Sequence, residues 1–354
     1  MKIFDLLEKS IELGASDIHL TAECPPIARV NGIFKNLSED NLTHQDTEYI
    51  SKSITTSENF QRLQKYGEID FSLQVDDGNR FRVNIYKQKG QYAIAIRIID
   101  SIVPKFDTLG LPDIISTFAE KYKGLILVTG ATGSGKSTTL ASLIDIINTN
   151  KEKHIITLED PIEYIHKHKK SIISQREIGT DTESFKSALR ATLRQDPDVI
   201  LVGEMRDSET VSIALTAAET GHLVFSTLHT IGAIKTIDRI VDMFPSGQQN
   251  QIRMQLSTVI EGIISQQLIP TIDGNNRVVS AEVMIPTPAV RNLIRENKTY
   301  QIQNIIQTGS KLGMKSMDQE LVNLYLDGKI SRESVLSRCF DYDYTFRLID
   351  STNY

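Results

Sequence analysis

The chain has 354 residues, of which 40% are hydrophobic and 24% charged, and its formal net charge is -6. This length allows two ordinary domains with sizeable cores, and the composition excludes a disordered or fibrous protein. The acidic balance argues against a surface that coats nucleic acid, although it does not exclude a basic groove or pore.

The N-terminal region has the pattern of a small α+β domain. Its first segment, 3–14, spaces apolar side chains with a helical period. From 18 to 98, short alternating segments predict strands, namely DIHL, PIARVNG, EIDFSLQV, RFRVNIY and YAIAIRII. The turn signals VNG at 30–32 and DDGN at 76–79 separate them as in hairpins, and one helical stretch is expected at about 43–65.

Targeting signals and cysteines indicate where the protein works. The N-terminus carries acidic residues where a secretory signal peptide needs an apolar core, and no apolar run approaches the roughly 20 residues that span a bilayer. Cys24 and Cys339 lie far apart and form no CxxC pair, which excludes a disulfide framework and a zinc ribbon. We therefore expect a cytoplasmic protein that reaches a membrane only through partners.

A second domain follows a linker. The segment SIVPKFDTLGLP, 101–112, contains two prolines and a glycine, so we expect domains at 1–100 and 113–354. The buried-type strands LILVT, HIITLE, VILVG and LVFST alternate with helical segments, which predicts a parallel sheet covered on both faces. From about 288 the pattern is helical, and Thr287 is expected to cap the first of these helices. The predicted fold class is α/β.

A phosphate-binding loop follows the first of these strands. GATGSGKS, 130–137, matches GxxxxGK[ST] in full, between a strand and the helix-forming LASLIDII. Its glycines let backbone N–H groups converge on phosphates at a helix N-terminus. Lys136 is expected to reach the β- and γ-phosphates of ATP, and the Ser137 hydroxyl to coordinate Mg²⁺. The residues expected to bind the nucleotide are Thr132, Gly133, Ser134, Gly135, Lys136, Ser137 and Thr138.

Two acidic segments supply candidate catalytic carboxylates. DVILVGEMRD is a buried-type strand that ends in Glu204, where a Walker B acid should stand. Gly-Glu replaces the more common Asp-Glu there, so we expect Glu204 to contact Mg²⁺ through a water. The loop EDPIE offers Glu163 to orient or deprotonate the attacking water, with Pro161 stiffening the loop. A solvated acidic turn is the alternative interpretation of EDPIE.

Two histidines bracket the strand in GHLVFSTLHT. Ligands gather at the carboxyl ends of parallel strands, so His229 is expected to face the nucleotide and His222 to lie at the opposite end. His229 is then placed to sense the γ-phosphate. The alternative for either residue is a polar side chain that satisfies a turn.

These four elements, in this order, resemble the secretion ATPase superfamily, the hexameric motors of type II and type IV secretion and of type IV pili. EDPIE is similar to its Asp box, DPDVILVGEMRD to its Walker B and TGHLVFSTLHT to its His box. GASDIHL and SALRATLRQDPD extend the match over essentially the whole chain. The resemblance implies a PAS-like N-terminal domain, a RecA-like P-loop NTPase domain with C-terminal helices, and a homohexameric ring with ATP bound between subunits.

Arginines in the first domain are candidates for charge supplied across a subunit interface, which ring enzymes of this kind need at the γ-phosphate. Strand alternation places Arg82 on the polar face of RFRVNIY, and Arg97 interrupts YAIAIRII. The pair matches the family's arginine fingers in motif and spacing. Ordinary surface arginines are the alternative. Arg190 and Arg194, one helical turn apart before Walker B, are secondary candidates.

Within the superfamily, two features favour the pilus-retraction (PilT-type) branch. AVRNLIREN, 289–297, resembles a C-terminal motif tied to retraction. The chain also lacks the longer N-terminal region and the cysteine-rich zinc insert that assembly-type relatives usually carry. Ala131 departs from the family, which most often has proline there.

The resemblance implies an ATP-hydrolysing motor that drives type IV pilus retraction and twitching motility. A pilus-extension or type II secretion ATPase of the same superfamily is the alternative, and a non-catalytic ATP-binding adaptor is a more distant one. The implied partners are other copies of the chain, an inner-membrane pilus platform protein and a paralogous accessory ATPase, with no nucleic acid. The expected location is the cytoplasmic face of the membrane, reached through the pilus machine.

Overall fold

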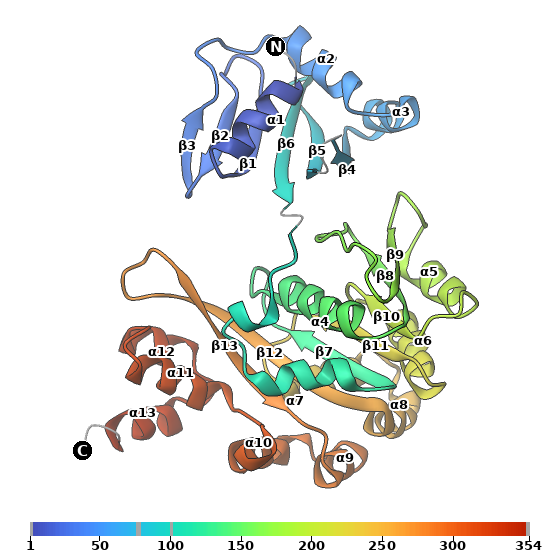
Figure 1. Cartoon of the computed structure of the whole chain (residues 1–354), viewed down its shortest axis with the longest axis vertical. Coiled ribbons are helices and arrows are strands. Elements are labelled where there is room, and N and C mark those ends of the chain that lie inside the picture. The colour runs from blue at the N-terminus through green and yellow to red at the C-terminus, as the bar shows by residue number, and fades with distance from the viewer. Residues whose placement is uncertain (1–2, 76–78, 100–101, 352–354) are drawn as a thin grey trace. The chain divides into compact units, whose positions relative to one another are not determined.

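The computed structural model describes residues 3–75, 79–99 and 102–351. Most of the DDGN turn and residue 101 of the predicted linker lie outside this range. The chain divides into two compact units, Met1–Ile102 with Glu163–Ile165, and Val103–Ile162 with His166–Tyr354 (Figure 1). No helix among the described residues is long and apolar enough to cross a membrane.

The first unit is built on a six-stranded antiparallel sheet with the order β3-β2-β1-β6-β5-β4. Its strands are β1 (Ala15–Leu20), β2 (Ile27–Val30), β3 (Ile33–Asn36), β4 (Glu68–Gln74), β5 (Arg80–Gln88) and β6 (Gln91–Ile99). Phe81, Val83 and Ile85 of β5 are fully buried, as the alternation predicted. This face of the sheet forms the core of the unit together with the helices.

Three helices complete the first unit, α1 (Ile3–Glu12), α2 (His44–Ser53) and α3 (Ser57–Tyr66). The single helical stretch expected at 43–65 is therefore two helices. Thr43 starts α2 with a capping box, and Thr56 caps α3 by accepting a hydrogen bond from the Asn59 amide. A threonine that caps a new helix ends the previous one, and helical periodicity alone does not reveal this.

The second unit contains a seven-stranded sheet with the order β13-β12-β7-β11-β10-β8-β9. Its strands are β7 (Gly124–Thr129), β8 (His154–Glu159), β9 (Ile172–Glu177), β10 (Val199–Val202), β11 (Leu223–Leu228), β12 (Ile260–Pro270) and β13 (Arg277–Met284). All neighbours are parallel except β12 and β13, which form an antiparallel pair. Four of these strands were predicted, whereas β9, β12 and β13 were not.

Helices cover both faces of this sheet. Leu125 and Leu127 of β7 face a core made with α5 (Phe185–Thr192), α6 (Ser208–Glu219), α7 (Ala233–Asp242) and α8 (Ser246–Val259). Ile126 and Val128 face the opposite core, made with α4 (Lys136–Asn150) and the short 3-10 helices η1 (Phe106–Thr108) and η2 (Asp113–Glu120). This two-sided burial explains the continuous apolar strands of the sequence.

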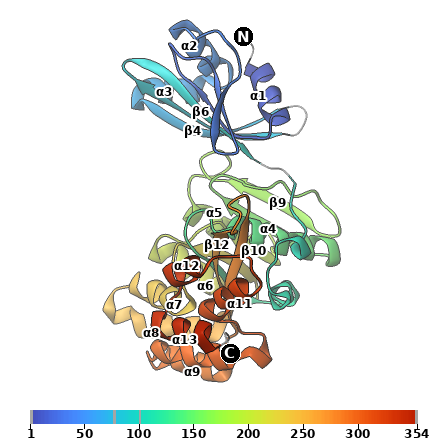
Figure 2. The same ribbon diagram turned by 90° about the vertical axis from the view of Figure 1, so that its left-hand side faces the viewer.

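The chain after β13 is helical, as expected. It forms α9 (Pro288–Arg295), η3 (Thr299–Gln301), α10 (Ile302–Thr308), η4 (Ser310–Leu312), α11 (Met317–Leu326), α12 (Arg332–Arg338) and α13 (Tyr342–Ser351). The Thr287 side chain caps α9 by accepting from the Val290 amide at 3.3 Å. The last three helices pack on one another and are seen together from the side in Figure 2.

Candidate nucleotide-binding site

The phosphate loop connects β7 to α4, as the motif required. Three of its glycines cannot be replaced by a residue with a side chain without strain or a clash. The Gly130 backbone has φ +142°, and a Cβ there would lie 2.4 Å from the Gln266 carbonyl oxygen. Gly133 and Gly135 have φ values of +76° and +90°, which residues with a Cβ rarely adopt. The loop therefore keeps its narrow turn only with glycine at these positions.

Lys136 is folded into this loop. Its Nζ donates to the carbonyl oxygens of Gly130 and Ala131, both at 2.9 Å. Burial lowers the pKa of the ammonium group, and the charge of Glu204 opposes that shift. These two carbonyl contacts leave the ammonium inside the loop, where phosphate oxygens can replace the carbonyl acceptors.

Ser134 gives independent support for an anionic ligand in the loop. The residue is 4% exposed, and its Oγ has no hydrogen-bond partner among the described residues. A buried hydroxyl without a partner is costly unless a ligand or water completes it. The N-terminus of α4 lies directly after it and leaves amide donors for an anion. A phosphate group fits this set of donors.

Glu204 is the second residue after β10, at the strand end where it was predicted. Gly203 before it lies against the neighbouring strand, since a Cβ there would be 3.1 Å from the Leu158 carbonyl oxygen. This close approach explains why the strand ends in Gly-Glu, with a single acid. The Glu204 side chain is only 12% exposed, and its Oε1 pairs with Arg206 Nη2 at 2.6 Å.

His229 follows β11 at the same edge of the sheet. Its Nε2 lies 3.4 Å from Glu204 Oε2, without hydrogen-bond geometry. The structure thus brings together Lys136, Glu204 and His229 beside the carboxyl ends of the parallel strands. His222 lies at the opposite end of β11, and its Nδ1 is 2.9 Å from the Ala217 carbonyl oxygen, which closes the end of α6.

The EDPIE loop after β8 is anchored at its base. Glu159 Oε1 accepts hydrogen bonds from Thr157 Oγ1 at 2.7 Å and from Gln175 Nε2 at 3.3 Å. The Ile162 amide donates to Glu177 Oε2 at 3.1 Å, and Ile162 is buried. This anchoring holds the chain up to the point where Glu163 begins the short segment that groups with the first unit.

Arg82, Arg97 and Glu163 belong together in the first unit. Arg82 and Arg97 are directly paired across β5 and β6, and Arg97 Nε donates to Asp17 Oδ1 at 3.0 Å. Glu163 keeps an exposed surface, but burial of its carboxyl group raises the pKa of that group, while the charges of Arg82 and Arg97 lower it. The three candidate residues therefore form one charged cluster.

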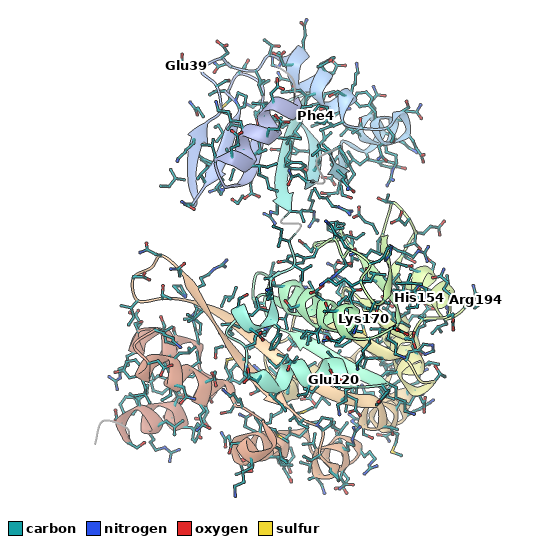
Figure 3. All side chains as sticks on the ribbon, viewed as in Figure 1. Phe4, Glu39, Glu120, His154, Lys170 and Arg194 are labelled. Atoms are coloured by element: carbon teal, nitrogen blue, oxygen red, sulfur yellow. The ribbon has the colours of Figure 1, made fainter. Side chains whose placement is uncertain are left out.

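Arg190 and Arg194 lie on α5 and in the turn after it. Arg190 Nη2 pairs with Glu209 of α6, to which Lys186 also binds. Arg194 points outward at the edge of the second unit, and its Nη1 donates to the Arg190 carbonyl oxygen at 3.3 Å (Figure 3). Both arginines make local contacts, and their candidate role at the nucleotide stays a prediction.

Sequence reasoning missed several partners of these residues. The structure, and not the sequence, identified Arg206 as the ion-pair partner of Glu204 and Asp17 as the partner of Arg97. Both lie inside motifs that the sequence had singled out, GEMRD and GASDIHL, but a pairing across strands or loops leaves no periodic signal. Among the described residues, no group of three or more histidine, cysteine or acidic side chains forms a metal site. A Mg²⁺ ion that nucleotide phosphates also bind needs few protein ligands.

The chain is similar to known proteins over most of its length, and not only at this site. The family model for Type II/IV secretion system protein matches residues 2–312. A type IV pilus retraction ATPase, PilT of Pseudomonas aeruginosa, is 47% identical over 94% of this chain and 97% of its own length. A twitching motility protein of Neisseria gonorrhoeae is 48% identical over 95% of this chain and 90% of its own length.

Two solved structures give the same result in three dimensions. A crystal structure of the pilus retraction motor PilT with bound ADP has a TM-score of 0.93 and 52% identity, over 98% of this chain and 99% of that one. The ATPase DotB of Legionella pneumophila has a TM-score of 0.79 and 30% identity over 94% of each chain. The predicted fold class, a PAS-like α+β domain before a RecA-like ATPase domain, is confirmed.

Proposed function

Since the chain belongs to the type II/IV secretion system protein family, we propose that it is an ATPase motor that retracts type IV pili. The observation that carries the proposal is the extent of the likeness to the pilus retraction ATPase and the twitching motility protein, which covers nearly the whole chain. A phosphate loop alone identifies a nucleotide site and not the work that the nucleotide drives.

The proposal assigns ATP to the phosphate loop. The backbone amides of Thr132–Thr138 donate hydrogen bonds to the phosphates, and the Ser134 hydroxyl adds one more donor. Lys136 Nζ then donates to phosphate oxygens in place of the two loop carbonyls. The Ser137 hydroxyl and Glu204, the latter through a water, would hold a Mg²⁺ ion, which would neutralise charge on the phosphates. The buried Ser134 hydroxyl and the small, glycine-dependent turn support this assignment.

Hydrolysis requires a positioned water and stabilisation of negative charge. We assign Glu163 to the water, His229 to sensing of the γ-phosphate, and Arg82 with Arg97 to charge stabilisation from a neighbouring subunit. The proximity of His229 to Glu204 supports the role of the histidine. The action of the arginines from a neighbouring subunit rests on the family resemblance.

The assembly that fits these roles is a homohexameric ring at the cytoplasmic face of the membrane. Its partners are an inner-membrane pilus platform protein and a paralogous accessory ATPase, and nucleic acid has no part in it. A pilus-extension or type II secretion ATPase is the second candidate, because the family contains motors that assemble pili as well as motors that retract them. The segment AVRNLIREN favours retraction between them.

Deletion of the gene, followed by complementation, tests this function. Cells without the protein are expected to carry excess surface pili and to lose twitching motility, whereas cells without pili would indicate assembly and contradict retraction. Wild-type protein should restore motility, and Glu163→Gln or Glu204→Gln should not. The purified variants are expected to bind ATP and to lose turnover, since each removes one catalytic carboxylate. Normal hydrolysis by either variant would disprove its assigned role.

A further inference from the structure

Glu163 lies in a short segment that leaves the second unit and returns to it. Residues 163–165 group with the first unit, whereas Ile162 before them and His166 after them belong to the second. The position of the Glu163 carboxyl therefore depends on how these two flanking residues are held. A displacement of about 1 Å in a catalytic group can lower a rate by about 100-fold, so the anchoring of this segment bears directly on turnover.

Two side chains of the edge strand β9 hold both flanks of this segment. Glu177 is buried, and its Oε2 accepts a hydrogen bond from the Ile162 amide at 3.1 Å. Gln175 Oε1 accepts a hydrogen bond from the His166 amide at 2.8 Å. Because side chains alternate along a strand, Gln175 and Glu177 lie on the same face of β9. One strand thus supplies an acceptor to the departing chain and another to the returning chain.

Gln175 also joins the two ends of the EDPIE loop to each other. Its Nε2 donates to Glu159 Oε1 at 3.3 Å, while its Oε1 accepts from the His166 amide. Glu159 is the last residue of β8, and its Oε1 is held in turn by the Thr157 hydroxyl at 2.7 Å. The Gln175 side chain therefore uses its donor where the loop begins and its acceptor where the loop ends. An apolar side chain of the same length provides neither.

The returning chain is also fastened to α4, the helix that begins with Lys136. Asn148, near the end of α4, is fully buried. Its Nδ2 donates to the Lys167 carbonyl oxygen at 2.8 Å, and its Oδ1 accepts from the Lys169 amide at 3.1 Å. The chain that follows the Glu163 segment is therefore held by the same helix that presents the phosphate loop.

We propose that Gln175 and Glu177 are positioning residues for ATP hydrolysis, which hold Glu163 where it orients the attacking water. This inference rests on the proposed function, in which Glu163 acts on that water. In this role neither Gln175 nor Glu177 touches the nucleotide. Loss of either side chain should therefore lower turnover and leave nucleotide affinity unchanged, because the phosphate loop keeps its own contacts.

Steady-state ATP hydrolysis and calorimetric titration with ADP, both on the full-length protein, test this role. Gln175→Met and Glu177→Met keep the length of the side chain and remove the acceptor. We expect each to lower kcat about tenfold or more and to keep the dissociation constant of ADP within about twofold of the wild-type value. Glu177→Gln retains an oxygen for the Ile162 amide and should recover most of the turnover. Ser174→Ala is the control on the opposite face of β9, where it removes only the hydroxyl at 3.1 Å from His154 Nε2, and it should hydrolyse ATP as the wild type does.

Wild-type turnover of Gln175→Met and Glu177→Met, beside an inactive Glu163→Gln, would overturn the positioning role and leave the role of Glu163 intact. A parallel loss of turnover and ADP affinity would overturn it in favour of a purely structural role. Turnover of Glu177→Gln as low as that of Glu177→Met would show that the acceptor for Ile162 is not what matters. Normal hydrolysis by Glu163→Gln would instead overturn the role of Glu163, and the positioning role with it.

Discussion

Glu282 is a buried residue of β13, and its carboxyl group is harder to ionise in the folded protein than in the unfolded chain. Burial raises its pKa to about 7 from 4.5, and the nearby Asp318 acts in the same direction, while the Ala233 and Met317 amides oppose the shift. The folded protein therefore binds a proton at this site between pH 4.5 and pH 7, where the unfolded chain has released it. The stabilisation is complete below pH 4.5 and is lost as the pH rises through 7.

We predict that the stability of the wild type falls more steeply with rising pH than the stability of Glu282→Gln. From pH 5 to pH 8 the free energy of unfolding of the wild type should fall by about 2 to 3 kcal/mol relative to the variant. Urea unfolding at the two pH values measures this difference. Glu333→Gln, which makes the same change at an exposed position of α12, is the control. A difference between wild type and Glu282→Gln that does not change with pH would contradict the burial argument.

The residues of the nucleotide site divide into those that leave a local signal and those that do not. Lys136, Glu204 and His229 were predicted, because each follows a buried strand of a parallel sheet and such strands end at one edge. Outside that site, the buried acids Glu282 and Asp318 were not predicted. Each is a single acid in an apolar or helical segment, and its burial depends on helices distant in sequence. The roles of Glu163, Arg82 and Arg97 stay predictions.

At the scale of elements, Arg291 joins two helices. Its Nη1 donates to the carbonyl oxygens of Ser257 and Thr258 at the end of α8, at 2.8 and 2.9 Å, and its Nη2 pairs with Glu261 at 2.7 Å. A cation at a helix C-terminus satisfies carbonyls that the helix leaves open and interacts favourably with the helix dipole. Part of AVRNLIREN therefore has a structural role, beside the retraction role that the resemblance implies.

We predict that Arg291→Ala lowers the free energy of unfolding by about 2 to 3 kcal/mol, because it leaves two helix-end carbonyls without this donor and removes one of the two cations that pair with Glu261, the other being Lys121. Arg295→Ala is a matched control on the same helix. Arg295 is exposed, donates to Asn292 at 3.4 Å and lies near the charge of Glu296, so its loss should change stability by less than about 0.5 kcal/mol. Equal stability of the two variants, measured by urea unfolding, would show that Arg291 does not join α8 to α9.

The strands of the second unit show which elements a sequence reveals. The strands β7, β8, β10 and β11 lie inside the sheet, are apolar on both faces and were predicted. At the edges, β9 (IISQRE) and β13 (RVVSAEVM) carry polar residues, and neither has the continuous apolar run of a buried strand. The long strand β12 directly follows α8, with no turn residues between them, and this hides its start.

At the scale of the whole molecule, the candidate catalytic groups divide between the two units. Lys136, Glu204 and His229 lie in the second unit, whereas Arg82 and Arg97 lie in the first with the Glu163 segment. In a ring, a first unit supplied by one subunit is available to the nucleotide of another. The sequence resemblance implies that one subunit supplies its arginines to the nucleotide of a neighbour. The composition of a single chain gives no sign of this arrangement.

We predict that Arg82→Ala and Arg97→Ala each abolish hydrolysis alone, and that mixing either with Lys136→Ala restores part of it. If the arginines act in trans, a site with an intact phosphate loop in the arginine variant receives its arginine from a Lys136→Ala neighbour. Random assembly of an equal mixture then gives about one complete interface in four. Steady-state ATP turnover of the mixture, after dissociation and reassembly of the rings, measures the recovery.

The alternative, action in cis, gives a different result in the same experiment. Every chain in the mixture then lacks either its own arginine or its own phosphate loop, so no complete site forms at any ratio of the two variants. Turnover that stays at the sum of the separate variants would therefore contradict trans action. A mixture of Lys136→Ala with Glu204→Gln is the control, because both changes lie in the second unit. Its failure to recover would show that restoration requires the first unit of one chain and the second unit of another.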